Sequence, residues 1–257
     1  MHLKMISCEV LARQVYYIAA FSPHVTDVEL VAKGLHNTPD VLRAALQRSL
    51  DATEPGKYDA ILLGYGLCSN SIAGLSCAHT QMVVPRAHDC ITLYLGSGER
   101  YAEEFRANPG TYWYTADYIE RGGDGTDLVA LGSAAEEAQM DKVYEEYVQK
   151  YGKDNADYLM EVMGAWKQHY NRAAYIEAAE MRLPDYTSQV QELATRRGWN
   201  FERLMGSLVI LRDLLEGRWD EGRFLIVPPG QTIAPVYDGR IIAGCEAQAQ
   251  ESVVSSD

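Results

Sequence analysis

The chain has 257 residues, of which 47% are hydrophobic and 23% charged, so it is long enough to bury a substantial core. Its formal net charge of −13 excludes a nucleic-acid or acidic-membrane surface, because such a field needs a strong basic patch to be overcome and the sequence shows none. The N-terminus lacks the apolar stretch of a signal peptide and no segment approaches the roughly 20 apolar residues of a membrane span, so we expect a cytoplasmic protein.

Apolar runs in the first ninety residues predict the strands of a parallel sheet. A strand over 3–8 leads into a helix over 9–20, and a short strand is expected at 28–32. Thr38 as N-cap and Pro39 at the first helical position predict a helix that ends before Pro55. Two further runs, 58–63 and 82–85, are apolar without alternation, which is typical of strands covered on both faces.

After Cys90 the pattern becomes more helical. The remaining predicted elements are a turn, a short helix and a second turn over 96–110, an aromatic stretch at 112–114, a mostly helical insertion over about 134–183, helices at 189–196 and 201–215, a buried strand at 224–227, a hairpin over 235–242 that turns at Asp238-Gly239, and a disordered tail over 246–257. The aromatic stretch either walls a flat ligand or belongs to the core. We therefore expect a single α/β domain over 1–257, with a Rossmann-like parallel sheet of about four to five strands and helices on both faces.

Three cysteines, Cys8, Cys68 and Cys90, each follow one of the predicted strands. The ends of parallel strands lie along one edge of a sheet, so these three thiols are candidates for one metal site. Soft sulfur ligands select zinc, cuprous copper or an iron–sulfur cluster. Without an export signal the five cysteines do not form a disulfide framework, and we expect Cys77 and Cys245 to be bystanders.

His88 and Cys90 are two residues apart, so in extended backbone they point to the same side and can bind one metal. Such a pair suits tetrahedral zinc, and three cysteines with an open fourth position equally suit a [4Fe–4S] cluster. No C-x-x-C spacing decides between them. Two other interpretations stay open: the cysteines are small buried hydrophobic residues, or Cys68 and Cys90 act as a redox pair.

The segment from Gly64 to Asn70 is a candidate cofactor-binding turn. Gly64 and Gly66 permit close approach of a ligand to the backbone, and free amides at Ser69 and Asn70 would bind an anion. Ser69 stands where the third glycine of a dinucleotide fingerprint would be, so a nicotinamide site is not favoured. Tyr65 is expected to face the site beside Cys68.

Arg86 and His88 lie at another strand end, where ligands of such sheets usually bind. Arg86 is a candidate for holding a carboxylate or phosphate, with a structural salt bridge as the equal alternative. His88 is expected to be a metal ligand or a proton donor. Together with Tyr65 they form the predicted catalytic set.

The chain resembles the domain-of-unknown-function family 1638. The motifs that carry the resemblance are Cys8-Glu9-Val10, Gly64-Tyr65-Gly66-Leu67-Cys68, Pro85 to Thr92, Leu95-Gly96-Ser97, Asn108 to Tyr112 and Val227-Pro228-Pro229-Gly230. The family's association with corrinoid-dependent methyl transfer implies a role in one-carbon metabolism, and the His-x-Cys pair is similar to the zinc ligands of cobalamin-linked thiol methyltransferases. Together with the three cysteines, the resemblance leads us to expect a metal-centre protein that acts on a small one-carbon or methylated substrate, as a methyltransferase if the centre is zinc and through an open iron if it is an iron–sulfur cluster. The alternative is an accessory or metallochaperone module for a corrinoid protein or methyltransferase, with the corrinoid supplied by that partner.

Overall fold

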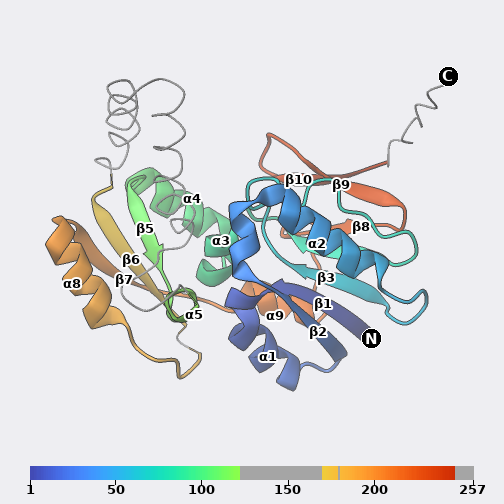
Figure 1. Ribbon diagram of the computed structural model, residues 1–257, viewed down its shortest axis with the longest axis horizontal. Coiled ribbons are helices and arrows are strands. Elements are labelled where there is room, and N and C mark those ends of the chain that lie inside the picture. The colour runs from blue at the N-terminus through green and yellow to red at the C-terminus, as the bar shows by residue number, and fades with distance from the viewer. Residues whose placement is uncertain (122–169, 179, 247–257) are drawn as a thin grey trace, which may run out of the picture.

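The computed structural model describes residues 1–121, 170–178 and 180–246, and it shows a mixed α/β fold (Figure 1). The larger sheet has the order β2-β1-β3-β4-β8, in which the first four strands are parallel and β8 runs antiparallel to β4. Its strands are β1 (His2–Cys8), β2 (Val25–Val31), β3 (Ala60–Gly64), β4 (Met82–Pro85) and β8 (Phe224–Val227). The predicted α/β class with a parallel-rich sheet is confirmed.

The order of the strands reverses at β1. The chain runs from β1 outward to β2 on one side and then returns to β3 on the other side, so the carboxyl ends of β1 and β3 are neighbours. Ser7 pairs with Gly64 in the register of these strands, which places Cys8 and Tyr65 next along the two chains. Ligands of open α/β sheets bind at such points of reversal.

Helices cover both faces of the larger sheet. α1 (Ala12–Phe21), which follows the short 3₁₀ turn η1 (Glu9–Leu11), lies with α9 (Val209–Leu215) on one face, and α2 (Pro39–Asp51), after η2 (Lys33–Asn37), lies on the other (Figure 1). The buried stripe of α2 is Leu42, Leu46 and Leu50, one residue per turn. Thr38 and Pro39 begin this helix as predicted, although the Thr38 side chain makes no capping hydrogen bond.

A second, three-stranded parallel sheet lies beside the first, in the order β5-β6-β7. Its elements are β5 (Thr111–Tyr114), β6 (Arg172–Glu177), β7 (Asn200–Met205) and the adjoining α8 (Thr187–Arg197). α3 (Cys90–Leu95) and α4 (Gly98–Ala107) connect β4 to β5, and α5 (Ala116–Glu120) follows β5. The aromatic stretch at 112–114 is therefore a buried strand of the core.

Two predictions fail in this second sheet. β6 lies inside the predicted helical insertion, and β7 occupies the first part of the helix predicted over 201–215. β6 is the central strand, buried from Arg172 through Ile176 and paired on both edges, so sheet pairing overrides its helical appearance. The rest of the predicted insertion, 134–169, and the tail after 246 lie outside the described residues.

The C-terminal hairpin consists of β9 (Gln231–Pro235) and β10 (Ile242–Glu246), paired antiparallel as predicted. The pairing nearest the turn joins Pro235 to Ile242, so the connection is 236–241 and not a two-residue turn at Asp238-Gly239. Within the described part of the chain, no helix is both long enough and apolar enough to cross a membrane.

Candidate thiol site and neighbouring cleft

The three predicted cysteines lie at the same edge of the larger sheet. Cys8 is the last residue of β1 and is buried, Cys68 follows β3, and Cys90 is the first residue of α3. The chain leaving β3 continues beside the chain leaving β4, since the Leu67 amide donates to Ala87 O and the Cys68 amide to His88 O, both at 2.8 Å. This extension of the pairing past the strand ends brings the cysteines together.

The backbone at Cys68 is held in an unusual conformation. Cys68, Ser69 and Asn70 have φ values of 45°, 55° and 65°, a run of three non-glycine residues in the left-handed region. The Ser71 amide (3.1 Å) and hydroxyl (2.6 Å) both donate to the Cys68 carbonyl and hold the turn closed. Each left-handed residue costs about 1 kcal/mol, and strain of this kind gathers at functional sites.

The thiols affect one another electrostatically. Burial raises the pKa of Cys8 to about 11. Burial, together with the Asp89 carboxylate and a Cys8 thiolate, raises the pKa of Cys68 to about 12. Burial also raises the pKa of Cys90, with Cys68, Asp89 and Cys8 acting in the same direction. Amides of Gly66 and Cys90 donate toward the Cys68 sulfur and act in the opposite direction. The three thiols therefore lie near enough for Cys8 to act on the other two, and the shared metal site stays a prediction.

Tyr65 belongs to the same cluster, which we call the thiol cluster: Cys8, Tyr65, Cys68 and Cys90. Its side chain is 1% exposed. Burial raises the pKa of its hydroxyl strongly, and Cys8 and Cys68 add to the effect. At neutral pH the cluster therefore presents neutral thiols and a neutral phenol.

The ligand geometry of a single ion is not formed in the described part of the chain, where no three His, Cys, Asp or Glu side chains stand in an arrangement that could hold one. His88 is exposed and lines the cleft described below, which Cys90 does not line. His88 and Cys90 would point to the same side only in extended backbone, whereas Cys90 begins a helix.

The glycines of the turn are used for packing within the protein. A Cβ on Gly66 would lie 2.6 Å from the Asp89 amide nitrogen and 2.8 Å from its Cα, and one on Gly64 would meet the Met5 and Ser7 side chains. The close approach that they permit is thus to the neighbouring chain. Ser69 and Asn70 are exposed.

Arg86 acts as a structural cross-link. Its guanidinium donates to the carbonyl oxygens of Glu221 (2.8 Å), Arg240 (3.0 Å) and Ile242, which joins the end of β4 to the hairpin and to the segment before β8. The partners are main-chain carbonyls, so neither the predicted anion contact nor the alternative salt bridge accounts for this arginine.

Asp89 connects the thiol cluster to the protein surface. Its carboxylate caps α3 by accepting from the Ile91 amide (3.0 Å) and also accepts from the Tyr101 hydroxyl (2.9 Å) on α4. Burial raises the pKa of Asp89. Sequence reasoning missed α3 and this cap, although an aspartate directly before an apolar run is a usual helix-start signal.

A cleft of about 730 Å³ opens between α4, the end of β4 and the hairpin connection. Arg86, His88 and Tyr101 line it, together with residues from α4 that the sequence did not single out, Phe105 and Arg106. The predicted catalytic residues are therefore divided: Arg86 and His88 face this cleft, whereas Tyr65 lies in the thiol cluster.

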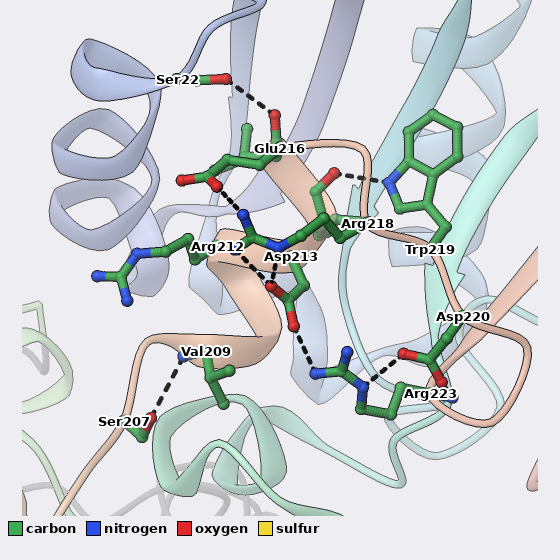
Figure 2. Close-up of polar contacts among 12 residues, drawn as sticks. Ser22, Ser207, Val209, Arg212, Asp213, Glu216, Arg218, Trp219, Asp220 and Arg223 are labelled. Carbon is green, nitrogen blue, oxygen red and sulfur yellow. Dashed lines mark hydrogen bonds and ion pairs between the residues drawn. The ribbon is translucent and has the colours of Figure 1, made fainter.

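A buried carboxylate with two partly exposed arginine partners fixes the wall of the cleft. Figure 2 shows the Asp213 carboxylate between the guanidinium groups of Arg218 and Arg223. Asp213 is 5% exposed, and Arg223 also binds Asp220 at 2.6 Å and lines the cleft. The Trp219 indole donates to Leu214 O (2.8 Å), so the whole connection from α9 to β8 is held in place.

The two remaining cysteines lie elsewhere. Cys77 is buried, and its sulfur is 3.9 Å from the His79 ring nitrogens. Cys245, on β10, is exposed and contacts the Thr232 hydroxyl at 2.9 Å. Neither is among the charges that act on the thiol cluster.

Fold and site together define an α/β protein whose candidate residues gather at the carboxyl ends of its parallel strands. The chain belongs to the family described as "Protein of unknown function (DUF1638)", whose model matches residues 30–215. The match contains Cys68 and Cys90 but not Cys8. No curated protein and no solved structure matches the chain.

Proposed function

We propose that Cys8, Cys68 and Cys90 hold a metal centre, and that an iron–sulfur cluster suits them better than zinc. The observation that carries the proposal is the placement of three cysteines at neighbouring strand ends where the strand order reverses, with Cys8 buried and Cys68 and Cys90 partly buried and close enough for Cys8 to act on both. Three thiolates so close to one another and to Asp89 are costly unless a cation neutralises them. A bound metal would supply that charge and keep the thiols deprotonated.

The choice between the two centres follows from spacing. The ligands of one zinc ion all touch the same atom, whereas the cysteines of a cluster bind different irons and stand farther apart. The described residues form no single-ion ligand group, yet the three thiols still act on one another. That combination supports the wider centre.

The chain's own residues would shape such a centre. The amides of Gly66 and Cys90 point at the Cys68 sulfur and would stabilise its thiolate, a known means of tuning a metal centre. The buried Tyr65 side chain would lie against the centre. A cluster with three cysteine ligands supplies an open iron that acts as a Lewis acid or passes electrons.

Single substitutions test this proposal. Cys8→Ser, Cys68→Ser and Cys90→Ser should each abolish stoichiometric metal, measured as iron, zinc and acid-labile sulfide after purification without oxygen. Cys77→Ser and Cys245→Ser are matched controls that should retain it. If the Cys8, Cys68 and Cys90 variants all retained the full amount of metal, the proposed metal centre would be refuted.

A role in one-carbon or methyl-group metabolism is a further part of the proposal, and it rests on the family resemblance. The two forms of that role are a metal-dependent methyltransferase and an accessory or metallochaperone module for a corrinoid-dependent enzyme. A pulldown that yields a stoichiometric methyltransferase, with no turnover of methyl donors by the isolated protein, would favour the accessory role. Turnover by the isolated protein would favour the enzyme.

A further inference from the structure

The cleft beside the thiol cluster has the size and lining of a small-molecule site. Its volume of about 730 Å³ lies within the range of roughly 300–1,000 Å³ that is typical of such sites. Apolar side chains from three segments form part of its wall: Phe105, Ile210 and Ile241. Phe105 is 54% exposed, a large apolar side chain that the fold itself does not bury.

Three of the charged side chains around the cleft are already engaged by the protein, and a fourth, the Glu99 carboxylate, accepts from the Ser97 hydroxyl at 2.8 Å. Arg86 donates to three main-chain carbonyls, and Arg223 is paired with Asp213 and Asp220. Asp238 is paired with Arg240 at 2.7 Å. These groups fix the walls of the cleft, and most of their hydrogen-bonding atoms are already used within the protein.

Arg106 and His88 differ from them. In the part of the chain that the structure describes, Arg106 makes one hydrogen bond, from Nε to Ala102 O on its own helix (3.2 Å), and has no carboxylate partner. The His88 side chain has no hydrogen-bond partner among the same residues, and both side chains line the cleft. An unpaired guanidinium and an imidazole over an apolar wall are complementary to an anion that carries an apolar body.

We propose that this cleft binds a small organic acid, with its anionic head at Arg106 and His88 and its apolar part against Phe105 and Ile210. The inference deepens the proposed function by naming the substrate class. The bound acid would lie next to the thiol cluster, because the Tyr101 hydroxyl in the cleft wall donates to Asp89, which caps the helix that begins at Cys90. Arg106 would attract the anion to the cleft, which is needed because the protein as a whole carries a net charge of −13 and repels anions.

Isothermal titration calorimetry with two probes of equal shape tests the proposal. Benzoate should bind the purified protein saturably, and benzamide, its neutral counterpart, should bind at least fivefold more weakly. Phenyl phosphate extends the test to the other common anionic head group: binding tighter than benzoate would identify a phosphate ester as the preferred anion within the proposed class.

Two variants and a control locate the site. Arg106→Gln and His88→Gln should each weaken benzoate binding at least fivefold, whereas Arg48→Gln, which removes an exposed arginine from α2, should leave it unchanged. No saturable benzoate binding, equal binding of benzamide, or an equal loss in Arg48→Gln would overturn the proposal. Metal content separates the two proposals: benzoate binding without metal would leave this site standing and refute the centre, and metal without benzoate binding would do the reverse.

Discussion

The thiol cluster and the C-terminal hairpin use the same residue types in different surroundings. In the cluster, Cys68 sits in a strained, desolvated turn and Gly66 is pressed against the Asp89 main chain. In the hairpin, Cys245 is exposed and a Cβ on Gly239 would meet nothing within 4 Å. The difference shows that burial and close contact, rather than residue type, decide which cysteine has a raised pKa and which glycine leaves no room for a side chain. Each prediction below sets a buried residue against its counterpart on the hairpin.

The largest contrast is expected in thiol reactivity. Because burial raises the pKa of Cys68 to about 12, its thiolate fraction at pH 8 is on the order of a thousandfold below that of an ordinary thiol with a pKa near 8.5. Iodoacetamide should therefore modify Cys245 first in the metal-free protein, and the rate at Cys68 should rise about tenfold per pH unit up to its pKa. Mass spectrometry of timed samples measures both rates, and equal rates at pH 8 would contradict the account.

The next contrast is between the two glycines. Gly66→Ala places a methyl group 2.6 Å from the Asp89 amide nitrogen, so the main chain must shift, and we expect a loss of about 3 kcal/mol in the free energy of unfolding. Gly239→Ala should change it by less than about 0.5 kcal/mol. Urea unfolding measures both values. A tolerated Gly66→Ala would mean that the two strand ends are less tightly packed than described.

The smallest contrast compares two ion pairs. Asp213→Asn removes a buried carboxylate from between Arg218 and Arg223, and it should cost about 2 kcal/mol because the carboxylate is buried while both arginines are partly hydrated. Asp238→Asn on the hairpin connection breaks an exposed pair and should cost less than about 1 kcal/mol. If the two variants unfold at the same urea concentration, burial does not set the value of these pairs.

Much of the larger sheet could be predicted from the sequence, and so could the position of Cys8, Cys68 and Cys90 beyond its strands. Buried strands such as 60–64 and 82–85 are wholly apolar, and parallel pairing places whatever follows them at one edge. The second sheet could not be predicted in the same way. β7, with Asn200, Glu202 and Arg203, gains its strand form from pairing with β6 rather than from its own apolar pattern.

The site was predicted only in part for a related reason. Cysteines after strands are visible in a sequence, but the cleft depends on α4 lying against the end of β4, a tertiary arrangement that no local pattern indicates. The Gly64 and Gly66 pair indicates close approach to the backbone, and the sequence alone predicts that a ligand makes it. What approaches is the chain at Asp89 and Ser7, which only the three-dimensional structure reveals.

The most direct test of the central claim is to purify the protein without oxygen and to measure its iron, zinc and acid-labile sulfide together with its visible absorption. The account predicts about four irons with matching sulfide and a brown colour. One zinc without colour would replace the cluster by a single-ion centre. No metal at all would contradict the central claim and return Cys8, Cys68 and Cys90 to the role of buried side chains.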